Sequence, residues 1–438
     1  MGERIMQRKR TYSVIVLCHN EQHIGHCINS IRCQLKGKDE IIIVDDHSDE
    51  DCRKILKKQA QEHQLTLIIA EEKRGNRSHN RNLGASVAAN DILVFIDGDI
   101  YFPEPVFHLM ENTLNVPGTV AVYSSIYGHS SSKFVLDSLL GFDYAEHLFD
   151  PQKWVELKTY DFLQDRRDKK SENLINGEMS WNYLYTSCAM ITKEAFEQAG
   201  GFDEAFEQWG AEDVDLGYRL AQIGKLKYCR ELAVFHLPHQ RDWYQDQLTN
   251  RANMYYMLDK YRTHIFELKI IYEKNLDLLS SYDELLRVMR AYEPPQRELP
   301  CYAQCLRWHP ISRNNPNGLI EFTDSHGTTN HMALLGIALP FPSGWFEVAY
   351  LPCDLLQYPR TLIPKIFQEF SRVAKKVFME PVRPGPRIHW DSTVVKAFGR
   401  SSPFKKVYYS SDSLQDFIYE PCDGWILVKP AFRFYRGE

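Results

Sequence analysis

Two carboxylates separated by one glycine stand at the end of an apolar run, in the segment Asp97-Gly98-Asp99. The run before them consists of Ile, Leu, Val and Phe, and a buried strand rarely ends in two charged groups unless a partner offsets their charge. A divalent cation is such a partner, because it prefers hard oxygen ligands, and the glycine allows a close approach of the backbone. We predict that this strand end holds a cation of the kind that also binds phosphates.

A second acidic group follows Trp209 and comprises Glu212, Asp213 and Asp215. The residues after it predict a helix that Gly224 closes, so Asp213 should lie in the first turn. Three carboxylates within four positions of a closed site suggest a general base, or groups that bind substrate hydroxyls. The alternative is a solvated acidic helix start, which the helix dipole favours. Trp209, next to the acidic residues, favours the first interpretation.

His236 is a candidate third ligand for the cation. It ends a predicted strand, residues 232–235, that follows the acidic helix. A lone histidine after a strand is more often structural, but the two strand-end carboxylates already need a cation, and imidazole is a common metal ligand. His239, three residues further on, is the second choice for the same role.

Polar residues also end the first two predicted strands. Asn20 and Glu21 follow the first strand, and Asp46 lies in the acidic segment 45–49 after the second. That acidic segment has two interpretations. It is either a ligand-binding strand end or a helix N-cap with acidic first-turn residues, which fits the helix dipole and needs no ligand.

The elements that must position these residues alternate between strand and helix. Short runs rich in β-branched residues, at 12–17, 39–46, 65–70 and 91–99, alternate with helical stretches at 23–35, 51–64 and 80–90. This pattern is typical of βαβ units, and it predicts an α/β fold with a parallel sheet. Ligands of such sheets bind at the carboxyl ends of the strands, so the strand-end residues should share one edge.

The composition describes a folded chain without a nucleic-acid partner. The 438 residues include 52 Lys and Arg against 58 Asp and Glu, a formal net charge of −6, and 44% of them are hydrophobic, which suggests more than one domain. Basic and acidic residues are mixed, which argues against binding to a polyanion. We expect no integral membrane segment and no signal peptide, because apolar runs are only strand-sized. Ten cysteines, mostly within apolar stretches, predict free thiols and a cytoplasmic location.

Taken together, the motifs within residues 12–262 resemble those of the family 2 glycosyltransferases of GT-A fold that carry a C-terminal galactosyltransferase-type motif, as chondroitin-polymerase-like enzymes do. The motifs are, in order, VIVLCHNE, IIIVDDHSDE, GNRSHNRNLG, LVFIDGD, GGFDEAF, WGAEDVDLGYRL and VFHLPH. Their order is more specific than any single motif. The resemblance implies a Rossmann-like domain for a nucleotide-diphospho-sugar.

The resemblance implies a donor site for a UDP-sugar. In such enzymes the acidic residue after the second strand binds the uracil and ribose, a role that falls on Asp46. Asn20 and Glu21 line the same nucleotide pocket, Asp97 lies toward the ribose or sugar, and Trp209 borders the donor.

The resemblance also implies a Mn²⁺ ion on the diphosphate. Asp99 is then the main ligand, with Asp97 as a further ligand. His236 matches, by its distance after the Glu-Asp pair, the histidine that completes the metal shell in related enzymes. An imidazole ligand favours Mn²⁺ over Mg²⁺, which is the alternative cation.

The Glu-Asp pair of this family matches Glu212 and Asp213. The resemblance implies that Asp213 is the general base and that Glu212 binds hydroxyls of the acceptor or sugar. Direct displacement needs one carboxylate to take the proton of the nucleophile and a cation to hold the departing UDP. Because no second carboxylate here suits the nucleophile of a double displacement, we predict inversion.

Two features differ from the family pattern. Ala189 stands where many relatives have an Asn in a turn that contacts the sugar, so the sequence leaves the donor sugar open. The charged run 165–172 suggests a mobile lid over the donor. Nearby, Trp181, Tyr183 and Tyr185 either stack on an acceptor sugar or roof the site.

We expect three parts of the chain: a GT-A domain at 1–262, a helical linker at 263–300 and a C-terminal α/β domain at 301–438. Residues 337–381 resemble the latter half of a class I methyltransferase. The glycine-rich loop that would hold the cofactor ribose is absent upstream, so we expect a degenerate domain without a working S-adenosylmethionine site. Acceptor binding or self-association as a homo-oligomer is its expected use.

The sequence therefore predicts a metal-dependent, inverting glycosyltransferase that moves a hexose or N-acetylhexosamine from a UDP-sugar. The acceptor is a glycan, a lipid-linked sugar or a peptide, and the sequence does not choose among them. The alternative is a catalytically silent module that binds a nucleotide sugar or carbohydrate and acts through its C-terminal domain. Glu212, Asp213 and His236 favour the enzyme, since a binding module needs no base beside a metal site.

Overall fold

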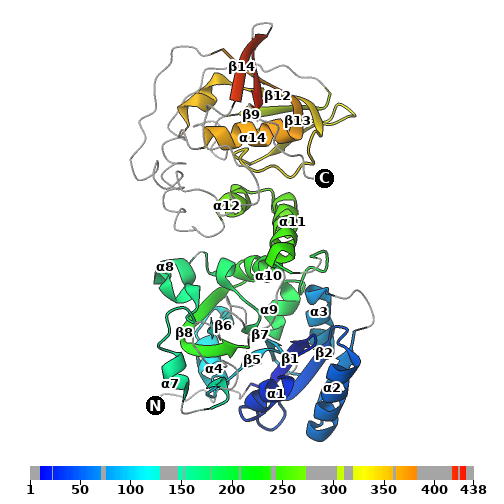
Figure 1. Ribbon diagram of the computed structural model, residues 1–438, viewed down its shortest axis with the longest axis vertical. Helices are drawn as coiled ribbons and strands as arrows, with labels where there is room; N and C mark the ends of the chain where they lie inside the picture. Colours follow the sequence, from blue (N-terminus) through cyan, green and yellow to red (C-terminus); the bar gives the residue numbers. More distant parts are fainter. Residues whose placement is uncertain are drawn as a thin grey trace, which may run out of the picture. The chain divides into compact units, whose positions relative to one another are not determined.

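The computed structural model describes residues 10–21, 23–70, 75–128, 147–150, 153–177, 179–206, 209–237, 243–272, 303–309, 319–358, 362–381, 417–422 and 425–430. The chain forms two compact units, Met1–Asn253 and Met254–Glu438 (Figure 1). Their boundary falls within helix α11 (Trp243–Tyr261). His239 and most of the expected linker, residues 273–300, lie outside the described ranges.

The first half of the first unit is the predicted series of βαβ units. Its elements are β1 (Tyr12–Cys18), α1 (Ile24–Arg32), β2 (Glu40–Asp45), α2 (Glu50–His63), β3 (Thr66–Ile69), α3 (Arg77–Val87) and β4 (Ile92–Asp97). The strands pair in parallel in the order β3-β2-β1-β4. Strands β1, β2 and β4 are buried along almost their whole length, as expected for a parallel sheet with both faces covered.

Helix α3 packs directly against β1 and β2. A Cβ atom at Gly84 would lie 2.5 Å from Ile15 Cγ2 and 3.1 Å from Val44 Cγ2, so only a glycine permits this approach. The close packing brings Arg77 and Arg81, in the first half of the helix, to the end of β4.

The second half of the unit completes a mixed sheet. Its elements are β5 (Ile100–Tyr101), α4 (Phe107–Leu114), β6 (Thr119–Tyr127), α7 (Trp154–Leu157), η2 (Arg166–Lys169), α8 (Glu172–Ile175), η3 (Ser180–Tyr183), β7 (Cys188–Thr192), α9 (Lys193–Gln198), α10 (Glu212–Ala221) and β8 (Lys225–His236). The described strands form one sheet in the order β3-β2-β1-β4-β7-β6-β8-β5. Strand β7 is antiparallel to β4 and β6, and β5 is antiparallel to β8. The predicted α/β fold is confirmed.

The second unit is built on another mixed sheet. Its described elements are α12 (His264–Tyr272), β9 (Cys305–His309), β10 (Leu319–Thr323), β11 (Thr329–Met332), β12 (Phe346–Leu351), η5 (Cys353–Gln357), α14 (Ile363–Val373), β13 (Ala374–Met379), β14 (Phe417–Cys422) and β15 (Trp425–Pro430). The strand order is β11-β10-β9-β12-β13-β15-β14. Strand β12, helix α14 and strand β13 occur in the predicted sequence, while the methyltransferase resemblance stays a prediction.

The described ranges also bear on membrane-spanning helices and on disulfide bonds. No helix in the described ranges is both long enough and apolar enough to cross a membrane. Eight cysteines in these ranges are free thiols, among them Cys18, Cys52 and Cys188.

Candidate functional site

The carboxyl ends of β1, β2 and β4 lie together at one edge of the first sheet. In the parallel register, Cys18 pairs with Asp45, and Leu17 pairs with Asp97. Asn20 reaches from the end of β1 to the turn after β2, where its Oδ1 accepts a backbone N–H at 2.6 Å. The strand-end residues that the sequence singles out are therefore close neighbours.

Of the aspartates at and after the end of β2, Asp45 and Asp49 have structural roles, whereas Asp46 is available as a ligand-binding residue. Asp45 is fully buried and accepts hydrogen bonds from its own turn and from α2, both at 3.0 Å. The N-cap interpretation of the acidic segment is confirmed for Asp49, whose carboxylate accepts an N–H from the first turn of α2. Asp46 receives the backbone N–H of Gly75 on both oxygens, at 3.0 and 3.1 Å. This bond fixes Asp46 beside the start of α3, and Asp46 remains the predicted nucleoside ligand.

Glu21 lies against the Asp97-Gly98-Asp99 segment. A Cβ atom at Gly98 would lie 3.2 Å from Glu21 Cγ, so a larger residue would displace the glutamate. Burial raises the pKa of Glu21 well above its usual value, and the charges of Asp99 and Asp97 raise it further. Three carboxylates that repel one another at a buried strand end would be relieved by a bound cation.

Strand β5 brings Asp99 and His236 together. It pairs antiparallel with β8, with Ile100 opposite His236. This pairing places His236 Nε2 at 3.2 Å from Asp99 Oδ2, and both residues are buried. Ligands about 2.1 Å from one ion and nearly at right angles lie ~3 Å apart, so the spacing fits two ligands of a single cation. One carboxylate and one imidazole form a donor set that suits Mn²⁺.

Among the described residues, no third side chain joins Asp99 and His236 as a ligand of a cation. Within these ranges, no group of three or more His, Cys, Asp and Glu side chains is placed to hold a metal ion. Asp97, the further predicted ligand, faces Arg81 and Arg77. Phosphate oxygens and water are suitable further ligands for a cation held by Asp99 and His236.

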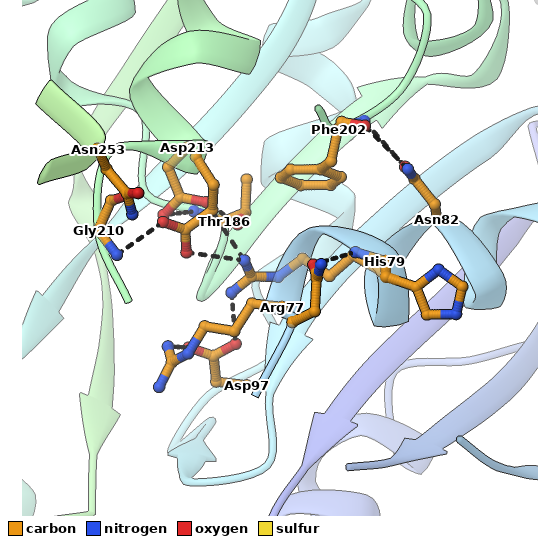
Figure 2. Close-up of polar contacts among 12 residues, drawn as sticks. Arg77, His79, Asn82, Asp97, Thr186, Phe202, Gly210, Asp213 and Asn253 are labelled. Atoms are coloured by element: carbon orange, nitrogen blue, oxygen red, sulfur yellow. Dashed lines mark hydrogen bonds and ion pairs between the residues drawn. The ribbon is translucent and has the colours of Figure 1, made fainter. Parts of the chain in front are cut away.

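A buried arginine of α3, Arg81, joins the two acidic groups of the sequence. Its Nη2 lies 3.0 Å from Asp97 Oδ1, and its Nη1 lies 3.3 Å from Glu212 Oε1 and 3.5 Å from Asp213 Oδ1. Figure 2 shows Asp97 and Asp213 approaching this contact from different elements, with Arg77 beside Asp97. Because arginine keeps its proton, carboxylates of β4 and α10 share one permanent cation.

The charge of Asp97 depends on these arginines. Burial acts to raise the pKa of Asp97, but Arg81 and Arg77 outweigh it and hold the pKa below its usual value. Asp97 is therefore ionised at neutral pH. Its contacts make it the carboxylate that fixes α3 against the end of β4.

Asp213 lies in the first turn of α10, as the sequence predicts. It accepts two hydrogen bonds from Thr186, one from the backbone N–H at 3.1 Å and one from the hydroxyl. Burial raises the pKa of Asp213 to about 6, Arg81 opposes the rise, and Glu212 adds to it. A carboxyl group whose pKa lies near the working pH is a more effective proton acceptor than an ordinary aspartate, so Asp213 suits a general base.

Glu212 is almost completely buried, and both of its oxygens have partners within the chain. One oxygen contacts Arg81, and the other accepts the backbone N–H of Gly210 at 3.0 Å. In this arrangement Glu212 holds the loop before α10 in place. The contacts differ from the hydroxyl binding that the sequence suggests, which stays a prediction.

Helix α11 fixes the loop that carries Trp209. Gly210 has a φ of 110°, and a Cβ atom there would lie 2.7 Å from Asn250 Oδ1, so the position requires glycine. Asn253 Nδ2 donates to the Gly210 carbonyl at 2.8 Å, and the Thr249 hydroxyl donates to the Trp209 carbonyl at 3.1 Å. The Trp209 side chain is only partly buried, which leaves it able to contact a ligand.

Both the aromatic residues expected near the site and the charged run 165–172 include buried side chains. Trp181 and Tyr183 of η3 are buried, and Trp181 packs edge-on against Tyr218 of α10 with ring centroids 5.2 Å apart. Their burial argues against stacking on an acceptor sugar and leaves the alternative that they roof the site. Asp165 and Arg167, in the charged run, form a buried ion pair, so the lid hypothesis is wrong for this part of the run.

Sequence reasoning missed Arg81 and Thr186. Arg81 carries a usable signal, because it stands three residues before Gly84 and so shares the helix face that packs on the sheet. An arginine on such a face requires buried acidic partners. Thr186 has no comparable signal, since a threonine before an apolar strand is unremarkable.

Two family models match residues of the first unit. The model of glycosyl transferase family 2 matches residues 13–199, and the model described as the N-terminal domain of galactosyltransferase matches residues 171–240. Validoxylamine A glucosyltransferase of Streptomyces hygroscopicus subsp. jinggangensis is 25% identical over 217 residues, covering 46% of this chain and 49% of that protein. Polypeptide N-acetylgalactosaminyltransferase 3 of Taeniopygia guttata is 27% identical over 234 residues, covering 49% of this chain and 35% of that protein.

The chain thus spans about half the length of these curated relatives, or less. Among solved structures, a mannosyltransferase from Pyrobaculum calidifontis in complex with GDP-Man and Mn²⁺ superposes with a TM-score of 0.43 at 17% identity, covering 66% of this chain and 78% of that one.

Proposed function

We propose that the chain, whose residues 13–199 match the model of glycosyl transferase family 2, is a glycosyltransferase. It is proposed to transfer a hexose or N-acetylhexosamine from a UDP-sugar to a glycan, lipid-linked or peptide acceptor, with inversion and with a divalent cation. Asp46, Asn20 and Glu21 are proposed to bind the nucleoside. Trp209 is proposed to border the donor.

One observation carries this proposal. Asp97 of β4, Glu212 and Asp213 of α10, and Arg81 of α3 meet within 3.5 Å, beside the strand end that also holds Asp99. A cluster of buried charges that includes a carboxyl group with a pKa of about 6 is typical of a catalytic site, which favours an enzyme over a silent binding module.

The residues divide the work of the reaction as follows. Asp213 takes the proton of the acceptor hydroxyl, and Thr186 holds its carboxylate in one orientation. Asp99 and His236 are proposed to hold Mn²⁺ or Mg²⁺, and a bound cation would offset the charge of the departing UDP. Arg81 keeps the base and Asp97 in register. With one base and no second carboxylate assigned as a nucleophile, the expected outcome is inversion at the anomeric carbon.

The relatives are consistent with either a hexose or an N-acetylhexosamine donor and do not favour one of them. Their names describe transfer of glucose and of N-acetylgalactosamine. In this chain Ala189 lies in β7 opposite Phe95, fully buried in the sheet, and its side chain offers no polar group to a sugar. We therefore leave the choice among UDP-hexoses and UDP-N-acetylhexosamines to experiment.

The second unit is proposed to bind the acceptor or to pair with a second copy of the chain. Its described sheet has strand order β11-β10-β9-β12-β13-β15-β14, and the residues proposed to bind the donor and the cation all lie in the first unit.

A donor screen tests the proposal. The full chain is incubated with Mn²⁺ and each common UDP-sugar in turn, and UDP released by slow hydrolysis is measured without any acceptor. We expect release from one or a few donors, and loss of that release in EDTA. Silence with every donor, while UDP still binds, would favour the alternative of a binding module. NMR of the product made from an α-linked donor tests inversion, since an α product would contradict it.

A further inference from the structure

Arg167 lies in the charged run that the proposed reaction leaves unused. It is buried in η2, and its guanidinium pairs with Asp165, with Nη2 at 2.6 Å from Oδ2. Asp165 is tied in turn to β6, where it accepts the N–H of Ile126 at 2.9 Å. Burial acts against the charge of Arg167, but Asp165 outweighs it and raises the pKa of Arg167 further. A buried pair of this kind is costly to assemble and calls for a reason.

The same guanidinium holds the chain segment that leads to the catalytic base. Its Nη1 donates to the carbonyl of Tyr183, the last residue of η3, at 2.8 Å. Its Nη2 donates to the carbonyl of Ser124 in β6, also at 2.8 Å. The planar group lies over the ring of Tyr185, 4.1 Å from the centroid. Arg167 thus fixes this segment through a fork of hydrogen bonds and a stacked ring.

The next residue in that segment is Thr186, which contacts Asp213. Its N–H lies 3.1 Å from Asp213 Oδ2 and its hydroxyl bonds to Oδ1 (Figure 2). The following residue, Ser187, accepts the N–H of Asp97 through its carbonyl at 3.1 Å. A shift of residues 183–187 would therefore move the two Thr186 donors away from Asp213 and the Ser187 carbonyl, which accepts the Asp97 N–H, away from the end of β4.

We infer that Arg167 is a positioning residue for the catalytic base, because it fixes Tyr183 and Tyr185 and thereby sets where Thr186 meets Asp213. The inference rests on the proposed function, in which Asp213 takes the acceptor proton. Asp165 neutralises the charge of Arg167 at close range, so the arginine acts through geometry rather than through its field.

Arg167→Lys distinguishes a geometric role of Arg167 from an electrostatic one. It keeps the positive charge but loses the fork of hydrogen bonds to Tyr183 and Ser124. With the donor that the screen identifies and a working acceptor, we expect kcat to fall roughly tenfold or more, with little change in KM for the donor. The acid limb of the kcat–pH profile should move upward by roughly one unit, because Asp213 loses a hydrogen bond that stabilises its charged form. Arg81, Glu212 and Asp97 also face Asp213 and are unchanged in the variant.

Arg166→Lys is the matched control, because Arg166 is the exposed neighbour in the same helical turn. It should retain the wild-type kcat and pH profile. Thr186→Val removes the hydroxyl that contacts Asp213 and tests the route directly. If Arg167 acts through Thr186, the double variant should shift the pH profile no further than Thr186→Val alone.

Three outcomes decide the matter. The inference would be overturned if the Arg167→Lys variant kept the wild-type pH profile while it bound UDP and had the wild-type melting temperature. Additive shifts in the double variant would overturn the route through Thr186. A wild-type chain that is inactive with every donor contradicts the proposed function instead, and the two failures are thus distinguishable.

Discussion

Arg81 decides the charge balance of the site at the scale of single residues. Asp97, Glu212 and Asp213 would repel one another at this spacing, and the buried guanidinium lies within 3.5 Å of all three. The cation keeps Asp97 ionised, and it limits the rise that burial imposes on the pKa of Asp213. One fixed charge therefore leaves Asp213, the proposed base, with a pKa of about 6 close to Asp97, which stays ionised.

The activity should report the titration of Asp213. A base with a pKa of about 6 is protonated and inactive below that pH and ionised above it. We expect kcat to rise with pH through about 6 and then to level, in an assay that follows transfer to acceptor.

Asp213→Asn should lower transfer by about 10²–10⁴-fold while UDP still binds. Asp161→Asn, an exposed carboxylate, is the control and should have no effect. Loss of UDP binding in the Asp213 variant would mean a wrong assignment.

Asp99 should connect the nucleotide to a cation. Because its carboxylate and the His236 ring lie 3.2 Å apart, removal of Asp99 leaves one ligand of the pair. We expect Asp99→Ala to weaken UDP binding in Mn²⁺ tenfold or more, which is about 1.4 kcal/mol, to the level measured in EDTA. Titration calorimetry with and without metal checks this. Asp51→Ala, an exposed position on α2, serves as the control, and an unchanged affinity in the Asp99 variant would end the metal assignment.

At the scale of elements, the contact between α10 and η3 positions Asp213, the proposed base. Helix α10 holds Glu212 and Asp213, and its Gly217 lies against the backbone of η3. A Cβ atom at Gly217 would lie 2.5 Å from the Trp181 carbonyl oxygen, and a backbone atom cannot turn aside as a flexible side chain can. The position of Asp213, the proposed base, thus depends on the lack of a Cβ atom at Gly217.

Gly217→Ala is therefore expected to destabilise the protein, although alanine favours a helix over glycine by about 1 kcal/mol. The forced separation of α10 from η3 should outweigh that gain and cost about 1–3 kcal/mol of unfolding free energy, with reduced transfer. Gly25→Ala in α1 is the matched control, because its Cβ would meet nothing nearer than the Gln59 amide at 3.7 Å. Thermal melts should show opposite shifts for the two variants, and equal shifts would contradict the argument.

At the scale of the whole molecule, the sequence predicts much of the first unit and little of the second. The βαβ series from β1 to β4 is found where the period of apolar residues places it, and helix α10 has Asp213 in its first turn, as predicted. These features are local, and hydrophobic period and capping residues report them directly. Of the described elements of the second unit, the sequence suggests only strands β12 and β13 and helix α14 between them.

The sequence by itself determined which residue types end the strands, their order along the chain and the family that this order indicates. Only the tertiary structure decided which partners they have. Arg81 and Glu212 are separated by 131 positions, and no periodicity relates them. The burial of Glu212 and the chain of contacts from Arg167 through Tyr183 to Thr186 likewise arise from packing between distant segments. Local propensity selects elements, whereas long-range contacts assign each charge its partner and so its pKa and role.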